Sequence, residues 1–501
     1  MEIKRTLDIG ANCSTIIVGK NVSTTGRVLV GHNEDDPRGL TATYLVPRKK
    51  HEKGETLTFD DGSAVIPEVE ETYAYIWSEV REPGGEPFAD AFYNEWGLFV
   101  CSNSAEVCQG QGEDLPEPLG GLGYGLRRLV AERAKSAREA VEVIADLVET
   151  YGYYSARTYN VIDKDEGWVV QIPPGHNFAA QRVPDDEVYY MPNWLTIRQI
   201  DFSDKEHKEF YWSKNVVGYA IEKGYYTPAV EGDYSDFDFA KAYQKKWDEK
   251  YNWERADTAW PMLLGHEPSN LRAFSEKPDG KIGPELIKKV LASHFDGKPY
   301  DASCGGTKSP HALGHFAVCN CMTLESDIVL FDEDPRLTMI YRSIPRPCAA
   351  PYTPWFGGIT ELPAGYNWMD EETAKRTHFL VTDRDFKYDP SMPYWVYQTL
   401  YYLTEANYAF NHKPVEESAR KLEEGWEAET AALTETAREL MKTDEKTALG
   451  LLTAFTAAKC QEGHDWAFRM IREIGERQLD ENIDWDDHGD TELMPEEVWT
   501  K

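Results

Sequence analysis

Apolar and polar residues alternate along much of the first half of the chain, and this pattern predicts many short strands. Two runs rich in β-branched residues, at 14–19 and 27–32, flank a turn-forming segment and predict a β-hairpin. Similar runs predict further strands, which lie at 41–46, 73–77, 97–103, 159–162, 168–172, 188–193, 316–330 and 338–343. So many strands require a large sheet, whose apolar face needs a covering layer.

Helical spacing of apolar residues is clearest at one place in the middle of the chain and at its end. From Leu126 onwards apolar residues recur every three or four positions and predict one long helix that Gly152 terminates. A shorter helix is predicted at 284–295, and the charged, aromatic section 201–250 is predicted to be helical and partly exposed. Beyond residue 390 three long helices are predicted, at 393–411, 415–442 and 446–478. Strands and helices together predict an α+β fold.

The chain shows no internal repeat and no low-complexity linker, so we expect one large domain. Its predicted parts are a core at 13–390, a helical C-terminal extension of the same domain at 391–479 and an acidic tail at 480–501. The leader at 1–12 has no structural role that the pattern reveals.

Charge and composition restrict the classes of partner. The 501 residues include 53 basic and 87 acidic side chains, and a net charge of −34 argues against binding nucleic acid. No apolar run is long enough to span a membrane, and the N-terminus lacks the apolar segment of a signal peptide. The eight cysteines are scattered, as in proteins of a reducing compartment. We expect a cytoplasmic protein without nucleic-acid or membrane partners, and leave open whether it forms a homo-oligomer.

The candidate nucleophile is Cys13, which stands at the start of the first predicted strand. The second predicted strand leads into a carboxylate, Asp35, which the hairpin brings near the cysteine. Cleavage between Asn12 and Cys13 gives an N-terminal residue with both a thiol and an α-amino group, whose pKa of about 8 suits a general base. The alternative is that Cys13 is a small buried apolar residue.

Several segments in a fixed order resemble one enzyme family. They are Cys13-Ser14-Thr15-Ile16-Ile17-Val18-Gly19-Lys20, Gly31-His32-Asn33-Glu34-Asp35, residues 127–152, Asp163-Lys164-Asp165-Glu166-Gly167-Trp168, Arg182-Val183-Pro184-Asp185-Asp186, Ser293-His294-Phe295-Asp296-Gly297 and Pro347-Cys348-Ala349-Ala350-Pro351-Tyr352. Together they resemble the PepD-type cysteine dipeptidases (dipeptidase A family) of the N-terminal-nucleophile hydrolase superfamily.

This resemblance implies a four-layered αββα fold, autocatalytic loss of residues 1–12 and cleavage of dipeptides through a thioester on Cys13. It implies that Asp35 orients the new α-amino group, and that the side chain of Asn193 and the backbone of Asn103 stabilise the oxyanion. Arg255 is the candidate for the charge near the nucleophile. No metal or organic cofactor is expected, and small peptides are the expected substrates.

Each of these residues also has a purely structural interpretation. Asp35 lies in a sequence typical of turns, and asparagines at strand ends, such as Asn103 and Asn193, are common loop formers. Arg255 is interpreted alternatively as part of a surface ion pair, with Arg272 as the other candidate for its role.

One departure from the family pattern concerns His32, because related enzymes usually carry arginine at this position. Histidine is only partly charged near neutral pH, so substrate positioning or thiol reactivity is expected to differ.

Two other functions stay open. One is an amidase of non-peptide amides, similar to bile-salt and penicillin V acylases, and the other is a non-catalytic, secernin-like scaffold.

A rival site contains four potential zinc ligands at short spacing, which are His311, His315, Cys319 and Cys321. The alternating sequence 316–322 predicts a strand, in which the two cysteines share one face and pack in the core. The pattern therefore favours the core interpretation over a metal site.

Overall fold

The predicted hairpin at the start of the chain forms the centre of a large sheet in the computed structural model. The structure describes residues 13–36, 39–59, 63–82, 90–116, 120–245, 253–311, 317–382 and 385–483. Seven antiparallel strands form this first sheet in the order β16-β14-β1-β2-β17-β18-β19. They are β1 (Ser14–Val18), β2 (Leu29–Asp35), β14 (Val188–Met191), β16 (Ser275–Glu276), β17 (Thr323–Leu330), β18 (Met339–Ser343) and β19 (Thr353–Phe356).

A second antiparallel sheet has eight strands in the order β15-β13-β12-β11-β10-β9-β8-β3. They are β3 (Leu40–Val46), β8 (Tyr75–Arg81), β9 (Ala91–Asn94), β10 (Phe99–Ser104), β11 (Arg157–Ile162), β12 (Gly167–Ile172), β13 (Ala179–Arg182) and β15 (Phe210–Trp212). Two small ladders join β4 (Lys49–Lys50) to β7 (Glu71–Thr72) and β5 (Thr56–Leu57) to β6 (Ile66–Pro67).

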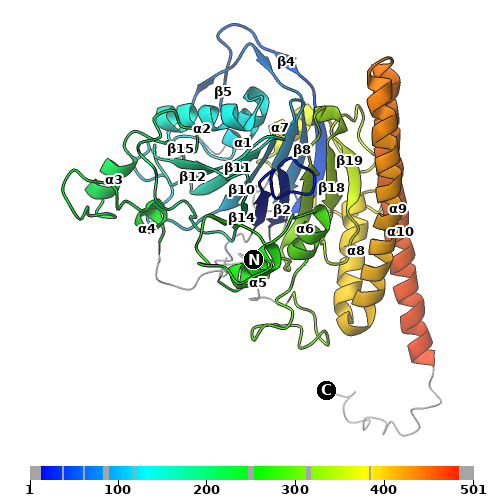
Figure 1. Ribbon diagram of the computed structural model, residues 1–501. Helices are drawn as coiled ribbons and strands as arrows, with labels where there is room; N and C mark the ends of the chain where they lie inside the picture. The colour runs from blue at the N-terminus through cyan, green and yellow to red at the C-terminus, as the bar shows by residue number, and fades with distance from the viewer. Residues whose placement is uncertain are drawn as a thin grey trace, which may run out of the picture.

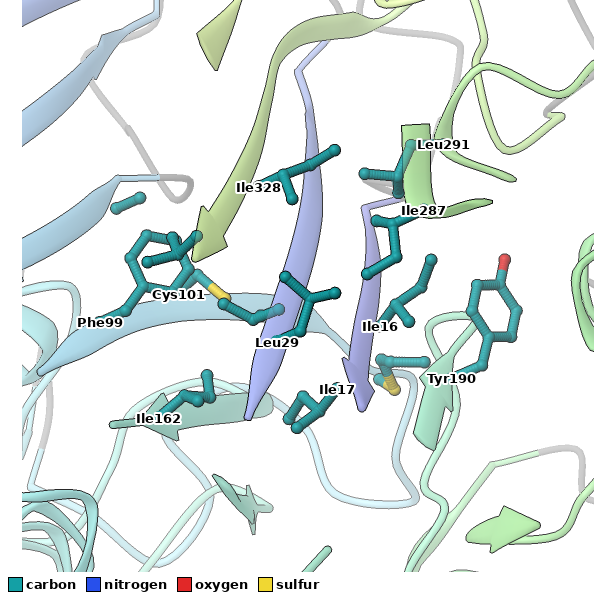
Figure 2. Close-up of a cluster of buried hydrophobic side chains, with 14 of the residues drawn as sticks. Ile16, Ile17, Leu29, Phe99, Cys101, Ile162, Tyr190, Ile287, Leu291 and Ile328 are labelled. Atoms are coloured by element: carbon teal, nitrogen blue, oxygen red, sulfur yellow. The ribbon is translucent and has the colours of Figure 1, made fainter. Parts of the chain in front are cut away.

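A buried apolar cluster joins the two sheets. It contains residues of the first sheet, such as Ile17 and Leu29, and residues of the second, such as Phe99 and Ile162 (Figure 2). Gly167 of β12 lies so close to β1 that a Cβ atom on it would come within 2.7 Å of the Ile17 side chain. The β-branched and aromatic residues that predicted the strands therefore bury their apolar faces between the sheets.

Helices contact each sheet (Figure 1). On the second sheet α1 (Gly125–Arg133) and α2 (Ala137–Tyr151) contact β9–β12, and on the first sheet α5 (Trp253–Leu264) and α6 (Pro284–Leu291) contact β14, β2 and β17. The C-terminal helices α8 (Pro393–Ala406), α9 (Tyr408–Met441) and α10 (Glu445–Ile483) pack on one another, and α9 and α10 also contact β19. The remaining helices are α3 (Val216–Glu222), α4 (Phe239–Tyr243), η1 (Pro335–Leu337) and α7 (Glu371–Thr377). The predicted α+β class is confirmed, and none of the helices described is both long and apolar enough to cross a membrane.

The prediction of one long helix ending at Gly152 is wrong at its middle. The structure has two helices in this stretch, α1 and α2, and residues 134–136 separate them. Ser136 caps α2 by accepting a hydrogen bond from the Glu139 backbone, and the Glu139 carboxylate accepts one from the Lys135 backbone. This serine–glutamate pair satisfies free N–H groups at the helix start and favours a new helix there.

Three other predictions need correction. Section 201–250 is not mainly helical where it is described, since it holds only β15 and two short helices, α3 and α4. The helix predicted at 284–295 ends at Leu291, and the strand predicted at 316–330 begins at Thr323.

The three C-terminal helices are confirmed with shifted ends, and α10 continues to Ile483, inside the predicted tail. Residues 1–12 and 484–501 lie outside the described residues.

Candidate active site

Cys13 lies directly before β1 and is buried, with 1% of its surface exposed. Because Ser14 pairs with Asn33 across the β1–β2 ladder, the next position places Cys13 beside Glu34. The Cys13 thiol donates a hydrogen bond to Glu34 Oε1 over 3.0 Å. The hairpin therefore places a carboxylate against the candidate nucleophile, and that carboxylate belongs to Glu34 rather than to Asp35.

A chain of hydrogen bonds continues from Glu34 between the two sheets. His32 Nε2 lies 3.1 Å from Glu34 Oε2, and His32 Nδ1 lies 2.8 Å from Thr15 Oγ1. The Thr15 hydroxyl donates to Asn103 Oδ1 over 2.8 Å, so it can only accept from His32. Nδ1 of His32 therefore donates, and an ionised Glu34 accepts from Nε2, so the two bonds together describe the charged imidazolium.

The electrostatic surroundings of His32 agree with this protonation state. Burial lowers the pKa of His32, but negative charge on the Cys101 sulfur and on the Glu34 carboxylate, with the hydrogen bonds that both accept, outweighs it and holds that pKa well above its usual value. His32 is thus positively charged at the position where the family resemblance expects arginine. The substitution of histidine for arginine preserves the charge.

Arg255 of α5 reaches Cys13 from the other side. Its Nη2 atom donates to the Cys13 carbonyl oxygen over 2.8 Å, and its Nη1 atom donates to Asn193 Oδ1 over 2.7 Å. Arg255 is fully buried, so its alternative interpretation as a surface residue is wrong. The other candidate, Arg272, stacks its guanidinium over the Trp194 ring at 5.1 Å from the centroid.

Asn193 follows β14 in the left-handed conformation, with φ of 66°, which asparagine adopts more readily than most residues. Its Nδ2 atom donates to the Ser104 carbonyl oxygen over 3.1 Å, so it joins the end of β14 to the end of β10. Asn103 lies one residue earlier on β10, and within the described part of the chain its buried Nδ2 atom has no hydrogen-bond partner. That amide is an available donor near the network.

Asp35 is buried on the opposite side of β2 from Glu34, because successive side chains of a strand alternate. Asn320 Nδ2 donates to its Oδ2 atom over 2.6 Å, whereas its Oδ1 atom has no hydrogen-bond partner among the residues described. Burial raises the pKa of Asp35 to about 7, although Arg255 opposes this by favouring the carboxylate. Asp35 therefore offers an unused acceptor for a cationic group.

The thiol of Cys13 is held in its protonated form in this uncleaved chain. Burial raises its pKa well above the usual value, and the negative charges of Glu34 and Asp35 raise it further. Activation of the sulfur thus requires a base that takes its proton as it reacts.

Comparison with known proteins identifies the family. The sequence profile of Peptidase family C69 matches residues 12–421. The chain belongs to peptidase family C69.

Curated relatives of this C69 chain are similar over most of their length. A probable dipeptidase B of Lactococcus lactis subsp. lactis (strain IL1403) is 26% identical over 426 residues, which cover 79% of this chain and 82% of the relative. A probable dipeptidase of Latilactobacillus sakei is 24% identical over 415 residues, covering 79% and 81%. A dipeptidase of Bifidobacterium longum (strain NCC 2705) is 27% identical over 320 residues, covering 58% and 60%.

Among solved structures, a variant of the conjugated bile acid hydrolase from Clostridium perfringens is similar to this C69 chain with a TM-score of 0.29 and 10% sequence identity. That likeness covers 72% of this chain and 93% of the other.

The structure of this C69 chain joins four of the five predicted site residues, Cys13, Asn103, Asn193 and Arg255, through one set of hydrogen bonds, and places Asp35 on the other face of β2. Arg255 donates to Asn193 and to the Cys13 carbonyl oxygen, and Asn103 joins through Thr15 and His32. Asp35 bonds to Asn320 on that other face. Sequence reasoning missed Glu34 as the contact of the thiol. The signal was the hairpin register, which places position 34, rather than 35, beside position 13.

The rival metal set is rearranged in the C69 structure. Residues 317–322 form a loop and not the predicted strand, so the argument that Cys319 and Cys321 share one strand face is wrong. His311 and Cys319 do come together, but with His294 and Cys348, and Cys321 is not in this group. His315 lies outside the described residues.

Proposed function

We propose that this C69 peptidase is a cysteine dipeptidase that loses residues 1–12 by self-cleavage and then hydrolyses dipeptides through a thioester on Cys13. The observation that carries the proposal is the buried Cys13 thiol at the start of the central strand, bonded to Glu34, with its own carbonyl oxygen held by Arg255. Family membership and the names of the curated relatives support the reaction class. Two packed sheets with helices against both support a four-layered αββα fold.

In the proposed maturation step, Glu34 takes the thiol proton while the sulfur attacks the carbonyl carbon of residue 12. The peptide bond between residues 12 and 13 breaks, its nitrogen takes up the proton, and residue 12 remains bound to the sulfur as a thioester. Water hydrolyses that thioester, which releases the leader and restores the thiol. The product carries a free α-amino group on Cys13.

In the proposed turnover, the new α-amino group takes the thiol proton and the sulfur attacks the substrate carbonyl. The unpartnered Oδ1 atom of Asp35 accepts a hydrogen bond from this amine and orients it. The side chain of Asn193, whose Nδ2 atom bonds to Ser104 in the structure, and the backbone of Asn103 stabilise the oxyanion, and each donor of this kind contributes about 3 kcal/mol. The C–N bond then breaks, the leaving amine takes the proton from the α-ammonium, and water hydrolyses the thioester.

The charges around the sulfur support this sequence of steps. Glu34 is paired with the His32 imidazolium and Asp35 lies within the field of Arg255, so each carboxylate near Cys13 has a nearby cation. A nearby cation favours the ionised form of a buried carboxylate, which can then accept a proton or a hydrogen bond from an amine.

The first experiment is the intact mass and N-terminal sequence of the expressed wild type, of Cys13→Ala and of Cys460→Ala. Cys460 is a matched control because it is also a buried cysteine, on α10. We expect wild type and Cys460→Ala to begin at Cys13 and Cys13→Ala to keep Met1. A wild type that keeps Met1 excludes the self-cleaving mechanism and favours a scaffold protein.

The second experiment compares substrates for the processed enzyme. A panel of dipeptides is set against N-acylated amines, including conjugated bile salts and penicillin V. We expect the highest kcat/KM with dipeptides and no turnover by Cys13→Ala. A preference for acylated amines would assign the same nucleophile to an amidase instead.

A further inference from the structure

A second cluster of reactive side chains lies away from Cys13, in the loops at one end of the first sheet. It consists of two histidines and two cysteines, which are His294, His311, Cys319 and Cys348. All four are buried, and one potential ligand atom from each lies within 4.8 Å of all the others. We refer to these four residues as the histidine–cysteine cluster.

We propose that the histidine–cysteine cluster binds one zinc ion, which fixes the loops around it. Two imidazole nitrogens and two thiolates form a donor set that zinc prefers, and four protein ligands are typical of structural rather than catalytic sites. Nothing in the proposed peptidase reaction uses these side chains.

The distances fit a tetrahedral ion. Zn–N bonds of about 2.0 Å and Zn–S bonds of about 2.3 Å place two nitrogens about 3.3 Å apart and a nitrogen about 3.5 Å from a sulfur. In the structure the Nε2 atoms of His294 and His311 are 3.0 Å apart. His311 Nε2 lies 3.7 Å from Cys319 Sγ and 3.8 Å from Cys348 Sγ. Shifts of a few tenths of an ångström bring these three contacts to the ideal values.

The surroundings orient the ligands as metal sites require. Glu405, on α8, lies with its Oε1 atom 3.0 Å from His311 Nδ1, and it accepts a hydrogen bond from Ser309 through its other oxygen. A carboxylate on Nδ1 keeps the proton there and leaves Nε2 free to bind the ion. His294 and Cys348 also line a cavity of about 920 Å³ beside α6 and α9, which gives an ion access to the cluster.

The ligands come from two connections. His294, His311 and Cys319 lie in the connection between α6 and β17, and Cys348 lies between β18 and β19. A shared ion joins these two connections and offsets the entropy lost when the four ligands are ordered.

The cluster is also connected to β2 through the residues on both sides of Cys319. The Val318 carbonyl accepts a hydrogen bond from Asn33 over 2.9 Å, and Asn320 donates to Asp35 over 2.6 Å. Fixing Cys319 therefore fixes the partner of Asp35. This consequence for catalysis rests on the proposed function, whereas the metal site itself does not.

The test is the metal content of the full-length protein, purified under reducing conditions without chelator. We expect about one zinc ion per chain by elemental analysis, and X-ray absorption at the zinc edge with two sulfurs near 2.3 Å and two nitrogens near 2.0 Å. A protein that contains little zinc and takes up none when zinc is added overturns the proposal. So does a spectrum with only nitrogen and oxygen neighbours.

Matched variants show whether these side chains are the ligands. Cobalt-loaded wild type and Cys460→Ala are expected to show sulfur-to-cobalt charge-transfer absorption, which Cys319→Ala and Cys348→Ala lose. His464→Ala is the control for His294→Ala, because His464 lies on α10 beside the Pro390 carbonyl oxygen and is not a member of the cluster. Equal metal content in Cys319→Ala and wild type would refute the assignment. If Cys319→Ala fails to fold, the wild-type cobalt spectrum decides alone.

Two more measurements separate this site from other accounts of the cluster. An intact mass two hydrogens lower without reductant, with a Cys319–Cys348 crosslinked peptide, would identify a disulfide and overturn the proposal. Removal of zinc by chelator is expected to lower dipeptide hydrolysis tenfold to a hundredfold, with recovery on adding zinc. Because zinc content is measured without substrate, failure of the peptidase proposal leaves this test intact.

Discussion

Asp35 allows a quantitative test of the site, because its burial makes ionisation costly. Burial raises its pKa from 3.8 to about 7. At 1.36 kcal/mol per unit, this shift corresponds to about 4 kcal/mol. The folded state holds the proton more tightly than the unfolded state, so stability from this group is greatest below about pH 4 and is lost as the pH rises towards 7.

The perturbation is Asp35→Asn in a Cys13→Ala background, compared with Cys13→Ala alone. Neither protein can cleave itself, so no α-amino group appears near position 35 and the surroundings remain those of the structure. The amide cannot ionise. We therefore expect the free energy of unfolding of the double variant, relative to the single variant, to increase by about 4 kcal/mol between pH 4 and pH 8.

The assay is urea unfolding of both proteins at several pH values, with midpoints compared at equal slopes. Any fixed cost of the amide is the same at each pH and cancels in the comparison. Asp201→Asn is the control, because Asp201 is exposed and the Ser203 hydrogen bonds lower its pKa. A stability difference for Asp35→Asn that does not change between pH 4 and pH 8 would refute the assignment of a raised pKa.

Three further predictions concern the network and the fold. Arg255→Lys keeps the charge, but one ammonium group cannot reach both Asn193 and the Cys13 carbonyl oxygen. We therefore expect kcat/KM to fall about a hundredfold with near-UV circular dichroism unchanged, and an unchanged kcat/KM would contradict the positioning role of Arg255. His32→Gln removes the imidazolium beside Glu34, so we expect the rate of self-cleavage at pH 7, measured by intact mass, to fall at least tenfold. A variant that cleaves itself at the wild-type rate would contradict a charged His32. Ser136→Ala removes the cap of α2 and is expected to cost about 1 kcal/mol in urea unfolding with kcat/KM unchanged; no loss of stability would show that the cap contributes nothing.

Local patterns were sufficient for the fold class and for most strands. The hairpin, the C-terminal helices and the end of a helix at Gly152 all depend on residues close in sequence, and these predictions are confirmed. The break before α2 was also local, but the apolar spacing continued across it and concealed the Ser136–Glu139 pair. In the loop before β17 the apolar alternation of a strand is present, but the backbone follows the contacts of Cys319 and Asn320 instead.

The sequence named the residues of the candidate site, but it could not give their contacts. Cys13, Asp35, Asn103, Asn193 and Arg255 were named from the family resemblance, and hydrogen bonds join all of them except Asp35. Their partners depend on register and on which face of a strand each side chain occupies, and composition and spacing do not define these. The second cluster shows the same limit. Two of its members lie in one short motif, but His294 and Cys348 reach it only through tertiary structure.

The alternation of side chains along β2 explains why this strand contacts both Cys13 and the loop around Cys319. His32 and Glu34 point to one face and bond to Thr15 and Cys13. Asn33 and Asp35 point to the other face and bond to the loop around Cys319. A shift of one residue in the pairing of β2 would exchange these two faces, removing Glu34 from the thiol and Asp35 from Asn320 together. Because the pairing with β1 on one side and β17 on the other opposes such a shift, the sheet itself aligns the proposed nucleophile with the proposed zinc-bound loop.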